Sequence, residues 1–338
     1  MTQTSDELLR INQLEKVFLL RQGWNEVLKA KRTGFSRDIL VHALNGVSFS
    51  LFAGERLCVV GESGCGKSTL ARTVIGLLTA TAGEIYYRDE RIDHLNDHQR
   101  MKFRKKIQMI FQNPYASLNP KMTVYQMLQE ALSIHLPDLN AEAQNQRICA
   151  LLDSVGLSTD AQHRYPHEFS GGQHQRISLA RALSVEPELI IADEPLSALD
   201  VSVQAQVLNL MMEKQQTHQL TYLFITHDLA VVEHFATRVV VMYLGRVCEI
   251  ADRATLFSAP KHPYTKALLS SIPRLDNLHL QPTLLKGEVP TTFDIPEGCI
   301  FCQRCPIANQ RCYEEIPVVQ IQPDGSEVAC HAVREGRC

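Results

Sequence analysis

The spacing of hydrophobic and polar positions changes several times along this chain, and each change predicts a different element. Alternating or uninterrupted apolar runs predict strands at residues 9–20, twice within 43–61, and at 83–92 (a hairpin), 188–194 and 221–227. Apolar residues three and four apart predict a helix from Lys67, a mostly helical stretch over 97–165, and helices at 172–185, 201–218 and 229–236. Strands that alternate with helices from residue 168 onward indicate a three-layer α/β core with a mainly parallel sheet.

The composition changes after Pro260, where proline, glycine and cysteine become frequent. We therefore predict a large domain over residues 1–260, with a helical subdomain at about 97–182, and a smaller C-terminal extension over 261–338. Residues 21–40 have no clean periodicity, which is typical of a loop or insertion. No internal repeat is visible.

The overall composition is that of a soluble globular protein, with 45% hydrophobic and 21% charged residues in 338. The formal net charge of -3 gives no support to a nucleic-acid partner, because such proteins carry a clear excess of Lys and Arg. No apolar run approaches the roughly 18 residues needed to cross a bilayer, and the N-terminus does not resemble a signal peptide. These features predict a cytoplasmic protein.

The stretch GESGCGKS fits the pattern G-x-x-x-x-G-K-[ST] between a buried strand and a helix. Its glycines allow successive backbone N–H groups to surround a phosphate, and the following helix adds its positive end. Lys67 then places a charge near the β- and γ-phosphates, while the Ser68 hydroxyl reaches Mg²⁺. The predicted ATP-binding residues of this phosphate loop are Gly61, Glu62, Ser63, Gly64, Cys65, Gly66, Lys67, Ser68 and Thr69.

Four polar side chains lie at or just after the ends of apolar stretches that predict strands, IQMIF, LIIADE and TYLFITH, and are expected at one edge of the sheet. Asp193 would hold Mg²⁺, and Glu194 would polarise the attacking water. His227 would contact the γ-phosphate, and Gln112 would reach Mg²⁺ or water. Taken alone, an acidic residue at a strand end can be a helix cap, and a single histidine there is usually structural.

The stretch FSGGQ at 169–173 opens a helix and completes a recognisable set. In their order and spacing, the phosphate loop, Gln112, this signature loop, LIIADE, SALD and His227 resemble an ABC-type ATPase domain over about residues 9–260. The resemblance implies an ABC-type P-loop ATPase fold, with a RecA-like core and antiparallel β and helical subdomains. It also implies that two domains pair, so that a second anion cradle acts on ATP held by the partner. The resemblance assigns this cradle to Ser170, Gly171, Gly172 and Gln173, adenine stacking to Phe18, and a place at the dimer seam to Asp200.

The C-terminal extension narrows the resemblance. The stretches HPYTKALLSSIPRL at 262–275 and GCIFCQRCPIANQRC resemble the extension of dipeptide and oligopeptide importer ATPases, most closely that of the dipeptide importer's second ATPase subunit. In that family the cysteine pattern implies a [4Fe–4S] cluster, here on Cys299, Cys305, Cys312 and Cys330. The local run C-x-x-C-x-x-C-P would instead favour Cys302 over Cys330. A structural zinc site is the chemical alternative, because four thiolates also suit tetrahedral zinc.

The resemblance implies an ATP-hydrolysing subunit at the cytoplasmic face of the inner membrane that energises import of dipeptides or oligopeptides. Its expected partners are a related but distinct ATPase subunit, two transmembrane permease subunits and, indirectly, an extracytoplasmic solute-binding protein. Residues 112–125 would dock on the membrane partner. The alternatives are a nickel or haem importer, a homodimeric arrangement, and a soluble ABC ATPase outside transport.

Overall fold

The computed structural model describes residues 6–20, 39–271 and 295–338, which fall into two compact units. Unit 1 comprises Met1–Leu8, Leu51–Cys58 and His94–Thr237, and unit 2 comprises Leu9–Ser50, Val59–Asp93 and Arg238–Cys338. Of the predicted insertion at 21–40, only the last two residues lie in the described part, at the start of strand β2.

A parallel sheet forms the centre of unit 1. Strand β7 (Leu189–Asp193) pairs in parallel with β6 (Ile107–Ile110) on one side and β8 (Thr221–Ile225) on the other. Every residue of β7 and β8 is buried, which explains why both strands are continuous apolar runs in the sequence. The backbone N–H of Tyr222 donates to Glu55 O at 2.8 Å, beside the start of β3 (Arg56–Val60). The predicted parallel arrangement is confirmed for β6, β7 and β8.

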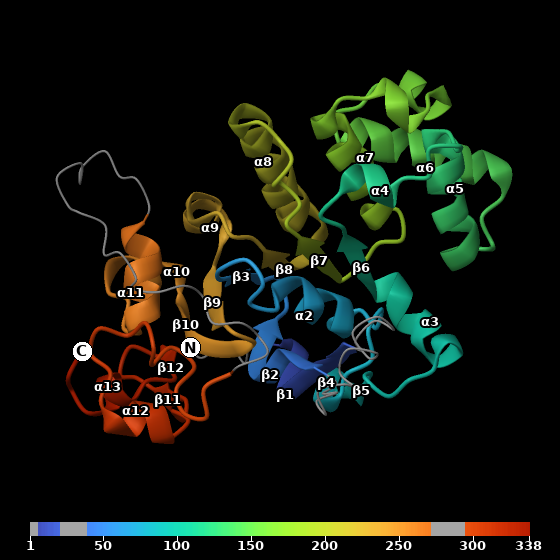
Figure 1. Cartoon of the computed structure of the whole chain (residues 1–338). Helices are drawn as coiled ribbons and strands as arrows, with labels where there is room; N and C mark the ends of the chain where they lie inside the picture. Colours follow the sequence, from blue (N-terminus) through green and yellow to red (C-terminus); the bar gives the residue numbers. More distant parts are fainter. Residues whose placement is uncertain (1–5, 21–38, 272–294) are drawn as a thin grey trace, which may run out of the picture. The chain divides into compact units, whose positions relative to one another are not determined.

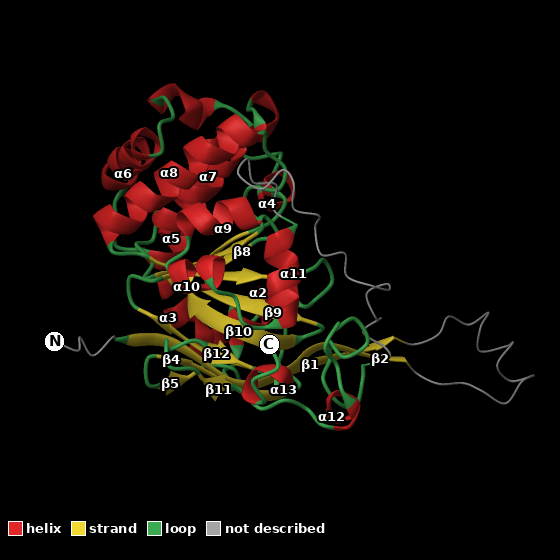
Figure 2. Ribbon diagram, turned by 90° about the vertical axis from the view of Figure 1, so that its left-hand side faces the viewer, coloured by secondary structure: helices red, strands yellow, loops and turns green. Residues whose placement is uncertain are grey.

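Helices account for most of the rest of unit 1 and are visible in Figures 1 and 2. They are α3 (Asp97–Lys106), α4 (Pro114–Ser117), α5 (Val124–His135), α6 (Ala141–Ser154), α7 (Gly171–Leu183), α8 (Val201–His218) and α9 (Leu229–Phe235), with short 3-10 turns at Thr159–His163 and Pro166–Glu168. Helix α7 packs against α5, α6 and α8. Helix α4 is the shortest of these α-helices, with four residues. Asn113 caps this single helical turn by accepting from Ala116 N, and Pro114 occupies its first position.

Unit 2 contains a four-stranded sheet in the order β2-β1-β4-β5. The strands are β1 (Glu7–Leu20), β2 (Ile39–Phe52), β4 (Ala82–Tyr87) and β5 (Glu90–Arg91). Strand β4 pairs antiparallel with β1 and with β5, so the hairpin predicted at 83–92 is confirmed. Helix α2 (Lys67–Val74) begins at the residue from which the sequence predicted a helix.

The other strands of unit 2 correct the prediction of a mainly parallel sheet. Strands β9 (Arg238–Tyr243), β10 (Arg246–Asp252), β12 (Glu327–Val328) and β11 (Gln320–Ile321) follow one another in the order β9-β10-β12-β11, and each pairing is antiparallel. Leu244 and Gly245 join β9 to β10 with φ of 42° and 75°, the positive values that a two-residue hairpin loop requires. The C-terminal extension therefore adds strands to the sheet edge at β10.

The described part of unit 2 contains four further helices: α10 (Arg253–Ser258), α11 (Pro263–Ser270), α12 (Gln310–Glu314) and α13 (His331–Arg334). The last two lie with β11 and β12 near the C-terminus (Figure 1). No helix within residues 6–20, 39–271 and 295–338 is both long and apolar enough to cross a membrane.

Candidate functional site

The phosphate loop lies in unit 2, between the last residue of β3 and helix α2. Gly66 is the N-cap of α2 and has φ of 103°, and an added Cβ would lie 2.2 Å from Ala43 O. Only glycine tolerates both this backbone conformation and this close approach. Because Gly66 has no side chain, it cannot cap the helix, and the positive end of α2 can face an anion.

Lys67 is the buried cation of the loop, with 5% of its surface exposed. Its Nζ donates to Gly61 O at 2.7 Å and to Glu62 O at 3.0 Å. Phosphate oxygens would offer this ammonium charged acceptors, which form stronger hydrogen bonds than carbonyls do. Burial raises the pKa of the neighbouring Cys65 thiol. Cys65 is thus kept as a neutral thiol and fills space beneath the loop.

In unit 1 the structure brings three of the predicted catalytic side chains together. Gln112 Nε2 donates to Glu194 Oε2 at 2.9 Å, and His227 Nδ1 lies 3.2 Å from Glu194 Oε1. Glu194 has φ of 45°, a conformation that non-glycine residues adopt rarely and that the surrounding structure must hold in place. Asp193 ends β7 and is 1% exposed. Amide, imidazole and carboxylate can together orient a water molecule beside Glu194.

The signature loop leads into helix α7 of unit 1. Ser170 is the N-cap: its Oγ accepts from Gln173 N at 3.4 Å, and Gln173 Oε1 accepts from Ser170 N at 3.0 Å. An added Cβ on Gly172 would lie 2.4 Å from Val203 Cγ1, and one on Gly171 would lie 3.2 Å from a methyl of Leu199. The two glycines therefore allow α7 to approach the start of α8, a packing role that the sequence did not predict.

His174 is a residue of this region that the sequence analysis missed. It is fully buried, and its ring nitrogens lie 2.7 Å from Ser170 O and 2.6 Å from Pro166 O. The Tyr115 ring packs on it with centroids 4.1 Å apart, and Arg181 Nη1 donates to Ser117 O at 2.8 Å. The segment at 112–125 and the signature helix are therefore joined at two points. In the sequence, the only sign of His174 was its position four residues after Ser170, which places the two on the same side of the predicted helix.

Two further predicted residues occupy simpler surroundings. Phe18 lies near the end of β1, where Lys16 Nζ is 5.0 Å from its ring centroid. Asp200 is exposed and precedes the first residue of α8 without capping it through its side chain. The adenine-stacking role of Phe18 and the seam role of Asp200 stay predictions.

Of the predicted cluster cysteines in unit 2, Cys299 and Cys305 lie on one stretch of consecutive turns, Cys312 lies in α12, and Cys330 precedes α13. Cys299 N donates to Cys312 O at 2.8 Å, and an added Cβ on Gly298 would lie only 2.5 Å from the same oxygen. All ten cysteines of the chain lie in the described part and are free thiols. Burial raises the pKa of Cys299 to about 12 and that of Cys305 to about 11. A bound metal would have to supply the positive charge that favours the thiolates.

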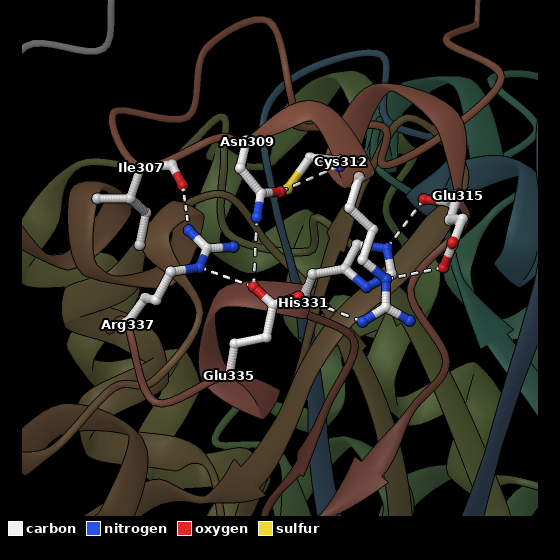
Figure 3. A network of polar contacts seen from close by, with 8 residues as sticks. Ile307, Asn309, Cys312, Glu315, His331, Glu335 and Arg337 are labelled. Atoms are coloured by element: carbon white, nitrogen blue, oxygen red, sulfur yellow. Dashed lines mark hydrogen bonds and ion pairs between the residues drawn. The ribbon is translucent and has the colours of Figure 1, made fainter.

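A network of polar contacts that includes Cys312 connects residues in and around α12 and α13 (Figure 3). Glu335 accepts from Arg337 Nε at 2.7 Å, and Arg337 Nη1 donates to Ile307 O at 2.6 Å. Cys312 Sγ donates to Asn309 Oδ1 at 3.2 Å. Among the residues that the structure describes, no three His, Cys, Asp or Glu side chains form a group that could hold a metal ion. Of the HPY stretch, residues 272–275 lie outside the described part.

The phosphate loop, the glutamate with its amide and histidine, and the signature helix define an ATP-binding cassette. Residues 44–197 match the ABC transporter family, and residues 248–312 match the oligopeptide/dipeptide transporter C-terminal region. The cassette MJ0796, a dimer solved in a post-hydrolysis state with ADP and phosphate, is 25% identical with a TM-score of 0.62, over 73% of this chain and 99% of its own. The ABC ATPase fold is thus confirmed.

Curated relatives match along nearly the whole chain. The oligopeptide transport ATP-binding protein AppF of Bacillus subtilis is 47% identical over 98% of this chain and 99% of the relative. The dipeptide transport ATP-binding protein DppF of Haemophilus influenzae is 47% identical, and the match covers 91% of this chain and 94% of the relative. The chain belongs to the family of oligopeptide and dipeptide ABC transporter ATP-binding proteins.

Proposed function

We propose that this protein binds and hydrolyses ATP to energise the import of dipeptides or oligopeptides through a membrane ABC transporter. The observation that carries the proposal is the contact of Glu194 with both Gln112 and His227, which equips the end of β7 for water activation. Whole-length likeness to peptide transport ATP-binding proteins supports the substrate class.

In this proposal the phosphate loop and the end of β7 have separate tasks. Lys67 and the loop N–H groups would hold the β- and γ-phosphates, and Ser68 and Asp193 would hold Mg²⁺, which neutralises phosphate charge, with Gln112 as a further contact to Mg²⁺ or water. Glu194 orients and deprotonates the attacking water, and His227 contacts the γ-phosphate. Phosphoryl transfer depends mainly on positioning and charge neutralisation, which these groups supply.

The proposal includes pairing with a second, related ATPase subunit at the cytoplasmic face of the inner membrane. The signature loop of each subunit would then contact ATP held by the other. The dimeric state of the solved cassette supports the pairing of two such domains. Permease subunits would dock on residues 112–125, where Tyr115 is 56% exposed and also contacts His174. Through the contact between the Tyr115 and His174 rings, docking of the permease would affect the position of the signature helix α7.

The catalytic role of Glu194 can be tested in vesicles that contain the assembled transporter. Glu194→Gln keeps the hydrogen bond to Gln112 within reach but removes the base, so ATP should still bind while hydrolysis falls at least about 100-fold. Uptake of a labelled dipeptide should fall in parallel. Hydrolysis at the native rate would exclude Glu194 as the base, and ATP-driven uptake of nickel or haem without peptide uptake would exclude the peptide substrate.

We also propose that Cys299, Cys305, Cys312 and Cys330 hold a [4Fe–4S] cluster. Four soft thiolate donors on a folded extension suit iron and sulfide, and a backbone hydrogen bond brings the segments that carry Cys299 and Cys312 together. Because the described side chains do not already form a metal-holding group, binding the cluster would require the thiols to turn toward one another. After anaerobic purification, the protein should contain iron and acid-labile sulfide in equal amounts, and Cys330→Ser should lose both while Cys302→Ser keeps them. Stoichiometric zinc in place of iron would contradict this assignment, and the reverse result for the two variants would place Cys302 in the ligand set.

A further inference from the structure

Glu62, the second residue of the phosphate loop, is held by residues far along the chain. Arg304 Nη1 donates to Glu62 Oε2 at 2.8 Å, and Glu62 N donates to the hydroxyl of Tyr264 at 3.0 Å. The Glu62 carbonyl accepts from Lys67 Nζ at 3.0 Å. The carboxylate, the N–H and the carbonyl of Glu62 are therefore all engaged, and two of their three partners belong to the C-terminal extension.

Arg304 is placed to make a strong contact. Its side chain is 8% exposed and that of Glu62 is 25% exposed, so solvent screens the ion pair much less than it screens a surface pair. Arg304 Nη1 also donates to the Tyr243 hydroxyl at 3.2 Å. Arg304 lies between Cys302 and Cys305, in a turn where the Arg304 N–H donates to Phe301 O at 3.1 Å.

An aromatic cluster makes the connection stiff. Phe301 is 1% exposed and packs on Tyr243 and Tyr264, with ring centroids 5.4 Å away in both cases. Tyr243 and Tyr264 pack on each other at 4.7 Å. Buried rings in mutual contact have few alternative rotamers, so the position of the cysteine-bearing turn fixes that of the two groups that hold Glu62.

We propose that Arg304 and Tyr264 are positioning residues for ATP binding, which they favour by keeping the Glu62 carboxylate away from Lys67. Without Arg304, this partly buried carboxylate would need another cation, and the Lys67 ammonium already contacts the same residue. The freed carboxylate would then compete with phosphate for Lys67. The C-terminal extension thereby helps to set the affinity of the phosphate loop for ATP. A movement of the turn that carries Cys302 and Cys305 would shift Arg304 and so change that affinity.

The inference rests on one part of the proposed function, namely that the phosphate loop is the ATP-binding site. It can be tested on the full chain. Arg304→Met should raise the Kd for ATP about tenfold, roughly the effect of one hydrogen bond to a charged group. Tyr264→Phe should raise it less, and Arg304→Lys should keep most of the affinity. The kcat of the assembled transporter at saturating ATP should stay within about twofold, because Gln112, Glu194 and His227 are unchanged.

Two further variants separate positioning from a general structural role. Arg337→Met removes an arginine of the same extension that contacts Glu335 and Ile307, so it is a matched control and should leave the Kd unchanged. Adding Glu62→Gln to Arg304→Met removes the competing carboxylate and should restore most of the lost affinity.

The following results would decide against the inference or its basis. A folded Arg304→Met protein with the native Kd would overturn the inference, and so would a double variant that binds no better than Arg304→Met. If Arg304→Met does not fold, Tyr264→Phe decides, because it removes the other group that holds Glu62; a folded Tyr264→Phe protein with the native Kd would then overturn the inference. A wild-type chain that binds no ATP would instead overturn the proposed function.

Discussion

The phosphate loop and the signature loop both place glycines before a helix, yet they use them for different physical reasons. Gly66 has φ of 103° and occupies the N-cap position of α2 without a side chain that could cap the helix. Gly172 lies within α7, and its missing side chain makes room for Val203. Ser170, not a glycine, caps that helix. One loop is built by backbone curvature, and the other by a capped helix packed closely on its neighbour.

This difference indicates where each loop can bind an anion. The phosphate loop can surround a phosphate with its own backbone and adds the buried Lys67. The signature loop offers the exposed Ser170 and the end of α7, with no lysine or arginine among its five residues. The phosphate loop can therefore hold the nucleotide by itself. The signature loop is better suited to contact a phosphate that a partner subunit already holds together with its metal ion.

The largest effect is expected from Gly66→Ala. The added methyl would lie 2.2 Å from Ala43 O, and backbone strain at positive φ costs a further ~1–3 kcal/mol. The affinity for ATP should fall at least about 100-fold, measured by displacement of a fluorescent analogue. Gly54→Ala is the control, because Gly54 also has positive φ, at 74°, but a Cβ there meets nothing within 4 Å. Equal losses in both variants would contradict the steric account.

A smaller effect is expected from Gly172→Ala. Its Cβ would lie 2.4 Å from a methyl of Val203, a stiff β-branched side chain, so the free energy of unfolding should fall by about 2 kcal/mol. Binding of ATP by the same chain should be unchanged, because the phosphate loop is not involved. Val203→Ala in the same chain should restore most of the lost stability in thermal unfolding. Absence of any rescue would show that Gly172 acts otherwise than by packing.

Much of the core follows from local patterns. The helix predicted at 201–218 has those bounds in the structure, and the strands at 188–194 and 221–227 differ only at their ends. Such elements are long or strongly apolar, so their type is determined locally. The expectation that Gln112, Glu194 and His227 share one sheet edge agrees with their contacts, because parallel strands bring their carboxyl ends together.

The remaining features depend on partners that local patterns do not specify. The antiparallel pairing of β12 with β10 joins segments far apart in the sequence, and both strands of the β11–β12 pair are only two residues long. The contact between Arg304 and Glu62 spans 242 positions and has no periodicity that could reveal it. The packing of Gly172 on Val203 likewise requires knowledge of how α7 and α8 meet.

The measurement that most directly tests the central claim compares ATP binding and ATP hydrolysis in a Ser170→Arg variant of the assembled transporter. If the signature loop acts on ATP held by the partner, this chain should bind ATP with native affinity through its own phosphate loop, while hydrolysis at the partner's site is lost. The isolated monomer should hydrolyse ATP slowly or not at all. A Ser170→Arg transporter with native turnover, or a strict monomer that hydrolyses ATP at the full rate, would contradict the account.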